Sequence, residues 1–252
     1  MSTPPLDGKV VLLVGASAGI GADAARVLAE NGAALMLVAR SKEPLAALTD
    51  ELTAAGHDVA FTAGDVSDAA SVAAFTDATV ARFGRLDGAF NNAATTQGGR
   101  LDAVTEAEFD RIMAVNVKGT WLCIREEIRV MERQGFGSIV NVSSIGGLRG
   151  SSGMGAYQAT KHAVIGLTRT AAHDFGPLGI RVNVLAPGPT ETPMLAETRR
   201  AIPGGVEARI AATPLRKAGT GPEVAETAAF LLSDRASHIS GVVLPVDGGF
   251  TA

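Results

Sequence analysis

Short apolar runs alternate with longer amphipathic stretches along most of the chain. The runs are rich in β-branched residues and span residues 10–14, 35–38, 59–62, 86–90, 138–142, 181–185 and 242–246. Helical periodicity fills the intervals, over about residues 19–31, 44–56, 68–83, 104–132, 155–176 and 222–234. Near-continuous apolar strands between helices are typical of a parallel sheet that is covered on both faces. The pattern therefore predicts an α/β, doubly wound fold with seven mostly parallel strands.

No linker, repeat or low-complexity segment divides the chain, so we expect one domain over residues 1–252. Pro245 lacks the amide hydrogen that a central strand needs, and its strand is therefore expected at an edge of the sheet. Prolines recur between residues 189 and 222, where the helical signal is weak. The sequence predicts a long irregular insertion there, with residues 190–215 forming a substrate lid.

The charge balance and the cysteine count exclude several classes of function. A net charge of −4 without runs of like charge gives no support for binding nucleic acid. The apolar run at residues 10–14 is too short to cross a membrane, and the start of the chain lacks a signal-peptide pattern. Cys123 is the one cysteine, and the histidines show no metal-ligand spacing. These observations favour a soluble cytoplasmic protein with no metal and no membrane partner.

A glycine-rich segment follows the first predicted strand and opens the first predicted helix. It reads Gly15-Ala16-Ser17-Ala18-Gly19-Ile20-Gly21. Glycines at such a turn let the backbone approach a phosphate, and the helix N-terminus supplies donors and a positive dipole. A plain turn is the alternative, but the strand–loop–helix context favours a Rossmann-type dinucleotide site.

The end of the second predicted strand bears on the choice between NAD and NADP. A site selective for NAD usually places an acid here, but the sequence has Ala39, followed by Arg40 and Ser41. An arginine can bind a 2′-phosphate through paired charge-assisted hydrogen bonds. We therefore favour NADP(H), while NAD(H) stays open because Arg40 alone is also compatible with a solvated charge at a strand end.

Tyr157 and Lys161 are four residues apart in a predicted helix and share one of its faces. The same face continues through Val164, Thr168 and Ala171, so the pair extends a stripe that is expected to be buried. A lysine in such a position either directs its amine to the solvent or has a chemical role. The sequence around the pair leaves both explanations open.

Further polar or turn-forming residues follow the other predicted strands. They are Asp65 after the third, Asn91-Asn92 after the fourth, Ser143-Ser144 after the fifth and Pro187-Gly188 after the sixth. Each alone is compatible with a turn or a helix cap. In a parallel sheet these strand ends share one edge, where ligands bind, so together they favour a single site.

In these residues the chain closely resembles the short-chain dehydrogenase/reductase family, in its short branch that includes 3-oxoacyl-acyl carrier protein reductases. The resemblance covers essentially the whole length, from Gly15 to Gly249. It rests on the glycine loop, the segment Asn91-Asn92-Ala93-Ala94, the helix asparagine Asn116, the serine Ser144 and the pair Tyr157 and Lys161, with the segment Pro187-Gly188 following.

The resemblance implies hydride transfer between a nicotinamide cofactor and a carbonyl or alcohol. Tyr157 is then the general acid or base, and Lys161 favours its ionised form and holds the nicotinamide ribose. Ser144 orients the substrate oxygen, and Asn116 retains a water that links Lys161 to the solvent. The cofactor-binding residues that it implies are Gly15, Ser17, Gly19, Ile20, Gly21, Arg40, Ser41, Asp65, Val66, Asn92, Ala93, Tyr157, Lys161, Pro187, Gly188, Thr190 and Thr192.

The chain departs from the family pattern at three positions. Val14 stands where threonine is usual, and its side chain cannot hydrogen-bond the glycine loop. Ala94 replaces a glycine, which restricts the backbone there. Ala18 occupies a position that is often basic in members that prefer NADP(H), so the cofactor choice rests on Arg40. We expect these changes to affect stability or affinity and not the reaction.

Two other functions fit the same residues. One is an NAD-dependent alcohol dehydrogenase of the family, and the other is a non-redox nucleotide sensor. The substrate cannot be read from the sequence, although residues 94–100, 145–155 and 190–215 are expected to form the pocket walls. By resemblance the protein is a homotetramer whose contacts involve the helices at 104–132 and 155–176 and the strand of Pro245.

Overall fold

The computed structural model describes residues 3–96, 98–201 and 204–252. At its centre lies a seven-stranded sheet in the order β3-β2-β1-β4-β5-β6-β7, and every neighbouring pair of strands is parallel. The strands are β1 (Val10–Val14), β2 (Ala34–Ala39), β3 (Val59–Ala63), β4 (Gly88–Asn91), β5 (Gly137–Val142), β6 (Ile180–Pro187) and β7 (Val243–Val246). All seven predicted strands are confirmed, and β7 with Pro245 is at an edge as expected.

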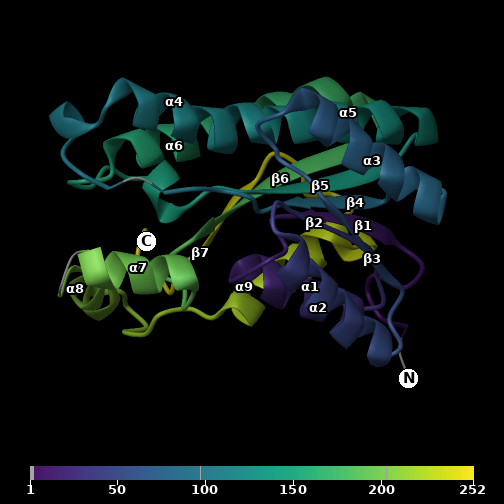
Figure 1. Cartoon of the computed structure of the whole chain (residues 1–252), viewed down its shortest axis with the longest axis horizontal. Helices are drawn as coiled ribbons and strands as arrows, with labels where there is room; N and C mark the ends of the chain where they lie inside the picture. Colours follow the sequence, from purple (N-terminus) through teal and green to yellow (C-terminus); the bar gives the residue numbers. More distant parts are fainter. Residues whose placement is uncertain (1–2, 97, 202–203) are drawn as a thin grey trace.

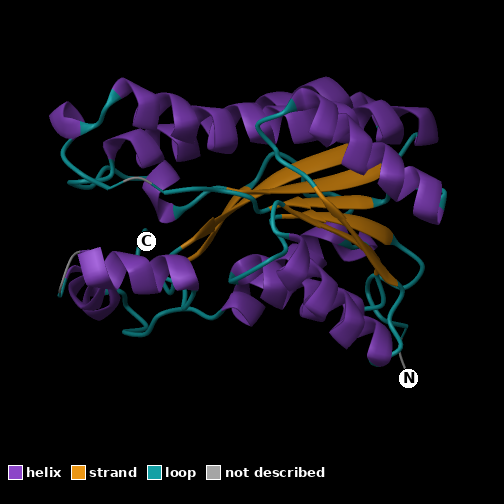
Figure 2. Cartoon of the chain, viewed as in Figure 1, coloured by secondary structure: helices purple, strands orange, loops and turns teal. Residues whose placement is uncertain are grey.

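Helices cover both faces of this sheet (Figures 1 and 2). The helices on one face are α1 (Ile20–Glu30), α2 (Lys42–Ala54) and α9 (Gly221–Leu232), and those on the other are α3 (Ala69–Phe83), α5 (Gly119–Gln134) and α6 (Gly155–Phe175). α4 (Glu106–Met113) precedes α5. Short 3-10 turns lie at Leu101–Ala103, Ile145–Gly147, Gly176–Leu178 and Asp234–Ala236. The predicted doubly wound fold is confirmed.

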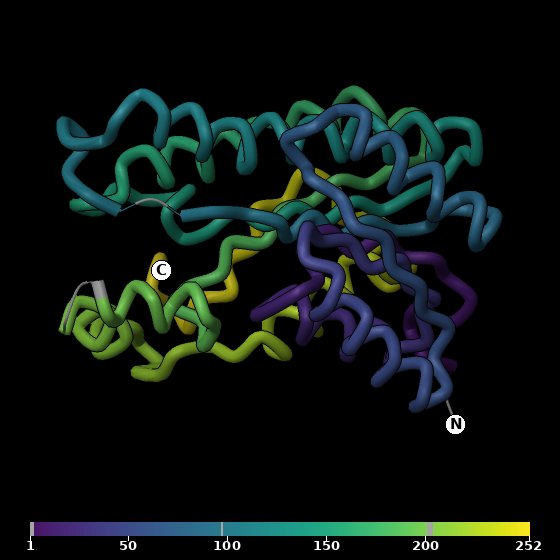
Figure 3. The backbone as a smooth tube through the Cα atoms, viewed as in Figure 1, coloured from purple at the N-terminus to yellow at the C-terminus, as the bar shows by residue number. Residues whose placement is uncertain are grey.

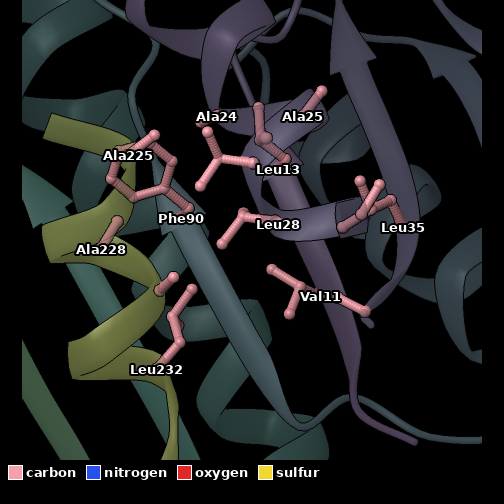
Figure 4. Packing of buried hydrophobic residues seen from close by; sticks show 14 of the residues in the cluster. Val11, Leu13, Ala24, Ala25, Leu28, Leu35, Phe90, Ala225, Ala228 and Leu232 are labelled. Carbon is pink, nitrogen blue, oxygen red and sulfur yellow. The ribbon is translucent and has the colours of Figure 1, made fainter. Parts of the chain in front are cut away.

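Strand alternation divides the core into two layers. Val11 and Leu13 of β1 point to the face of α1 and α9, while Leu12 and Val14 point to the face of α3 and α5. All four are at most 1% exposed. Figure 4 shows the first layer, where alanines of α1 and α9 let both helices approach the strands closely. Strands buried on both faces explain the continuous apolar runs in the sequence.

The path of the chain reverses next to β1. It runs outward from β1 through β2 to β3 and then returns to form β4 on the other side of β1, as the tube in Figure 3 shows. The loops that leave β1 and β4 therefore diverge to opposite faces of the sheet. Such a switch point opens a crevice at the carboxyl ends of the strands, where ligands bind in this kind of fold.

The segment predicted to be an irregular insertion contains two helices, α7 (Pro193–Ala201) and α8 (Gly205–Ala212), so this expectation is wrong. They lie together near the C-terminus, beyond the carboxyl end of β6 (Figure 1). Arg199 of α7 binds Glu191 at 2.6 Å and Glu207 of α8 at 2.9 Å, which ties the two helices together. Residues 202–203 of this predicted lid lie outside the described residues.

The single helix predicted over residues 104–132 is interrupted. Between α4 and α5 the structure has a π-helical turn at Ala114–Lys118. A π turn has one extra residue and changes the direction of nearby side chains, and such turns are frequent at functional sites. Asn116 lies within this turn and is 1% exposed. The interruption therefore gives Asn116 a position that a regular helix would not give it.

Candidate active site

The carboxyl ends of the strands enclose a cavity of about 580 Å³. Its walls come from the loops after β1 to β6, the start of α6, the helices α7 and α8, and the segment after β7. Most of the sequence-predicted site residues line it: Gly15, Ser17, Gly19, Ile20, Arg40, Ser41, Asp65, Val66, Asn92, Ala93, Ser144, Tyr157, Lys161, Pro187, Gly188, Thr190 and Thr192. Gly21 and Asn116 do not line the cavity, but Gly21 packs against Gly15 and Asn116 bonds to Thr95, and both of these residues do line it.

The glycine loop packs directly against the segment that follows β4. Gly15 has a φ of +90°, and a Cβ there would lie 2.6 Å from the backbone nitrogen of Ala93. A Cβ on Gly21 would lie 1.9 Å from the carbonyl oxygen of Gly15. Only glycine fits these two positions, because both are in contact with backbone atoms. The loop can therefore present its amides and the N-terminus of α1 to the cavity.

Asn92 holds this loop from the neighbouring strand. Its side-chain Nδ2 donates to the carbonyl oxygen of Gly15 at 3.0 Å. The backbone amides of Gly15 and Ala16 donate to the carbonyl oxygen of Val38, at 2.7 and 3.1 Å. These bonds fix the loop from two sides.

The cavity end near β2 and β3 carries Arg40 and Asp65. Arg40 is exposed, and Ser41 lies beside it at the start of α2. Asp65 accepts hydrogen bonds from the hydroxyl and the amide of Ser67, at 2.7 and 2.8 Å. These bonds, together with the charge of Arg40, lower the pKa of Asp65. Among the described residues no acid at the end of β2 competes for the guanidinium of Arg40.

Lys161 points into the interior and not to the solvent. The residue is 3% exposed, and its Nζ donates to the carbonyl oxygen of Val142 at 2.9 Å. Nζ also lies 5.6 Å from the centre of the Tyr157 ring. Burial lowers the pKa of Lys161 to about 8. The buried-stripe prediction is confirmed, and the explanation by a solvent-directed amine is excluded.

Tyr157 and Ser144 lie on the same wall of the cavity. Ser144 precedes a short 3-10 turn, and its hydroxyl oxygen accepts from the amide of Gly146 at 3.0 Å. Burial raises the pKa of Tyr157, and a hydrogen bond with Ser144 opposes this shift. The sequence predicts the reverse, a pKa lowered by the charge of Lys161. In the structure the cost of burying the tyrosinate is larger.

Asn116 connects the wall beside β4 to α6. Its Oδ1 accepts from the amide of Thr95 at 2.8 Å, and its Nδ2 donates to the Thr95 carbonyl at 2.9 Å. Nδ2 also donates to the hydroxyl of Thr160 at 3.0 Å, one residue before Lys161. Within the described residues there is no direct bond between Asn116 and Lys161. Its amide therefore fixes the distance between two walls of the cavity.

Comparison with known proteins identifies the family. A family model described as enoyl-(acyl carrier protein) reductase matches residues 15–251. A levodione reductase of Leifsonia aquatica is 40% identical over 252 residues, covering 97% of this chain and 94% of that protein. The chain belongs to the short-chain dehydrogenase/reductase family. Its relatives in this comparison carry the names of dehydrogenases and reductases, which supports an oxidoreductase.

Further members of the short-chain dehydrogenase/reductase family are similar over the whole chain. An A-factor type gamma-butyrolactone 1'-reductase of Streptomyces virginiae is 43% identical over 248 residues, covering 98% of this chain and 96% of that protein. The crystal structure of levodione reductase has a TM-score of 0.93 at 39% identity, over 97% of this chain and 98% of that one. A single-residue variant of actinorhodin polyketide ketoreductase with NADPH has a TM-score of 0.92 at 30% identity, over 96% and 97% of the two chains.

Two departures from the short-chain dehydrogenase/reductase pattern have simple structural consequences. Val14 is 1% exposed and packs in the core, and the bonds to Val38 and Asn92 hold the loop that follows it. Ala94 does not have a positive φ; among the described non-glycine residues only Arg216 does. The alanine is therefore unstrained at this position. The expectation that these changes affect stability or affinity and not the reaction stays a prediction.

The sequence missed several residues of the cavity wall. The pocket walls were expected from residues 94–100, 145–155 and 190–215, and members of all three ranges line the cavity; residue 97 lies outside the described residues. The wall also contains Arg111 of α4 and Phe250 after β7. Neither belongs to a motif, and only the fold brings them to the site. A helix start at Thr192-Pro193 was a signal for α7 that the sequence did offer.

Membrane spans and metal sites do not occur among the described residues. No helix there is long and apolar enough to cross a membrane. In the same part of the chain, no group of three or more His, Cys, Asp or Glu side chains could hold a metal ion. Cys123 is buried, and burial raises the pKa of its thiol well above the ordinary value.

Proposed function

We propose that this protein transfers hydride between NADP(H) and a carbonyl or secondary-alcohol substrate, with Tyr157 as the proton donor or acceptor. One observation carries the proposal: Ser144, Tyr157 and Lys161 line the same cavity as the glycine loop. The cavity therefore offers a hydroxyl for proton exchange, a second hydroxyl and a buried cation next to a dinucleotide site. These three groups surround the position that the substrate would occupy. We also propose that residues 1–252 act as one domain and that residues 190–215 cover the substrate.

The residues around the glycine loop fit a dinucleotide. A Cβ at Gly15 or Gly21 would displace backbone atoms that shape the loop, and Gly19 has a φ of +55° where α1 begins. The loop amides would hold the diphosphate, and Asp65 and Val66 would border the adenine. Lys161 would hold the nicotinamide ribose, and Thr190 and Thr192 would flank the nicotinamide. The nicotinamide supplies or accepts the hydride.

Tyr157 would give its proton to the carbonyl oxygen during reduction and take it back during alcohol oxidation. Hydride and proton together convert C=O to CH–OH, so the step is balanced. Because burial raises the pKa of Tyr157, the hydroxyl stays protonated near neutral pH, which suits the acid role. The base role needs positive charge nearby, and Lys161 with the oxidised nicotinamide would provide it.

Ser144 and Lys161 have separate supporting roles. Ser144 would donate a hydrogen bond to the substrate oxygen and hold it next to Tyr157. Lys161, whose pKa of about 8 keeps it mainly protonated at neutral pH, would stabilise negative charge on the tyrosine oxygen. Asn116 would retain a water between Lys161 and the solvent through the wall that it braces.

The preference for NADP(H) rests on the end of β2. Ala39 offers no carboxylate for a ribose 2′-hydroxyl, whereas Arg40 and Ser41 line the cavity there. A guanidinium can hold a 2′-phosphate through charge-assisted hydrogen bonds. The ketoreductase structure with NADPH, at 30% identity, supports the same assignment. The relatives compared above are named reductases, so carbonyl reduction is the direction to test first.

Arg40→Ala tests the cofactor proposal. The variant should bind NADPH about tenfold or more weakly, because charge-assisted bonds to the phosphate are lost, while NADH affinity stays within about twofold. Both affinities are measured by nicotinamide fluorescence titration, with turnover of a carbonyl panel as the second readout. Equal losses for NADPH and NADH contradict the assignment. Tight NADPH binding without turnover of any carbonyl would instead favour a nucleotide sensor.

A further inference from the structure

The cavity carries the opposite charge from the protein as a whole. The chain has a net charge of −4, yet five cations line the cavity, namely Arg40, Arg111, Arg149, Lys161 and Arg209. Asp65 is the one acid among the described lining residues, and it lies at the end of β3, away from α8. Arg40 and Lys161 already have cofactor roles in the proposed function. Three arginines remain for the part of the cavity that the substrate enters.

Two of these arginines are held by nearby groups. Arg149 donates from Nη1 to the carbonyl oxygen of Phe250 at 3.0 Å, and its guanidinium lies 5.3 Å from the centre of the Phe250 ring. Arg111 donates from Nη1 to the hydroxyl of Thr95 at 2.8 Å and from Nη2 to the carbonyl oxygen of Thr96 at 3.5 Å. These contacts fix both side chains in the wall of the cavity.

Arg209 differs from the other two. It lies on α8 and is half-buried, and it has no hydrogen bond or ion pair from its side chain to any of the residues that the structure describes. Of the acids in residues 190–215, Glu191 and Glu207 both bind Arg199, and Glu197 is exposed on α7 and does not line the cavity. A guanidinium is charged at every physiological pH, so Arg209 brings an uncompensated cation to the cavity.

Apolar side chains share the cavity wall with Arg209. Leu195 of α7, Val206 of α8 and Phe250 line the same cavity, and Val206 is 2% exposed. A cation that is partly removed from water favours an anionic partner. Apolar walls favour a hydrophobic body attached to that anion. The wall of the lid therefore combines one free positive charge with an apolar surface.

We propose that the substrate is a carbonyl or alcohol compound with a carboxylate on an apolar body, and that Arg209 binds this carboxylate. The proposal rests on the proposed function for the position of the substrate, and it adds the chemical class. Arg209 reaches the cavity from the lid, whereas Ser144 and Tyr157 reach it from the end of β5 and the start of α6. Such a substrate is held at both ends, which orients its reacting carbon.

A binding experiment tests the proposal without requiring turnover. Cyclohexanecarboxylate and the neutral cyclohexanecarboxamide are titrated calorimetrically into the enzyme saturated with NADPH. The wild type should bind the carboxylate about tenfold or more tightly than the amide. Arg209→Ala should remove this difference and leave the amide affinity unchanged, while Arg209→Lys should retain part of it. Arg200→Ala, on an exposed position of α7 that does not line the cavity, is the matched control and should behave as the wild type.

Three results would overturn the proposal. One is equal affinity of the wild type for the two probes, and another is an equal loss for both probes in Arg209→Ala. The third is weaker NADPH binding in Arg209→Ala, which would assign the guanidinium to a cofactor phosphate. Tyr157→Phe should bind the carboxylate as the wild type does. A failure of the proposed redox reaction therefore appears in turnover, and a failure of this inference appears in the probe affinities.

Discussion

Lys161 keeps its cation inside the molecule, where the carbonyl oxygen of Val142 is its hydrogen-bond partner. Burial of an ammonium is unfavourable, and the lowered pKa of about 8 reflects that cost. Its ammonium lies close to the ring of Tyr157, whose pKa burial raises. Each group is thus in an environment that disfavours its own charge. A ligand that brings positive charge near Tyr157, or negative charge near Lys161, would favour the ionised form of that side chain.

Glu127 gives a prediction on pH and stability. It is fully buried in α5, accepts from Nδ2 of Asn91 at 3.1 Å, and its Oε1 has no partner among the described residues. Burial raises its pKa from 4.5 to about 8. Between these values the folded state binds a proton that the unfolded state has lost. Stability therefore falls as pH rises through this window, by up to about 1.4 kcal/mol per pH unit.

Glu127→Gln removes this titration and keeps the shape of the side chain. The wild type should lose thermal stability between pH 5 and pH 8, while the variant should show a flatter profile and a higher melting temperature at pH 8. The range stops at pH 8 because the lowered pKa of Lys161 adds stability as pH rises above that value. Parallel pH profiles of the two proteins in thermal unfolding would contradict a neutral, buried Glu127.

At the level of single site residues, the motifs predicted most of what the cavity contains. Tyr157, Lys161 and Ser144 could be placed because a helical period and a strand end fix their directions. The direction of the pKa shift of Tyr157 could not be predicted, because the shift depends on how deeply the fold buries the side chain. Arg209 lies in the range expected to form a wall, but its lack of a partner depends on Arg199 and is visible only in the structure.

At the scale of helices and strands, hydrophobic periodicity predicted the strands of the sheet and the helices that cover it. Apolar runs found all seven strands, because strands buried on both faces leave little room for polar residues. α7 and α8 were missed, since their helical pattern is weak and the ion pair between Arg199 and Glu207 that joins them cannot be read from the sequence. The π turn around Asn116 was also missed. Asn116 in this turn bonds to Thr95 and Thr160, which are distant in the sequence, and local helix propensity carries no information about such contacts.

At the scale of the whole molecule, the protein is acidic while the cavity is cationic. An acidic protein with a cationic cavity attracts anionic ligands to that cavity while its surface repels them elsewhere. The proposed cofactor and the proposed carboxylate substrate are both anions. Binding of each should therefore weaken as ionic strength rises, because salt screens the field that guides them.

The proposed homotetramer is also a property of the whole molecule. Trp121 of α5 and Phe109 of α4 are 45% and 41% exposed, on the helices expected to form subunit contacts. Large apolar side chains at such positions are typical of interfaces. Light scattering should give a mass four times the 25.6 kDa of one chain. Trp121→Glu should lower that mass, and a monomeric wild type would contradict the assembly.

The central claim is that Tyr157 supplies the proton while a nicotinamide supplies the hydride. The most direct test is the single-turnover oxidation of NADPH, followed by its absorbance, with the best carbonyl substrate of the panel. Tyr157→Phe should lower this rate about a hundredfold or more, while its NADPH affinity stays within about twofold of the wild type. A Tyr157→Phe variant that oxidises NADPH at the rate of the wild type would contradict the claim.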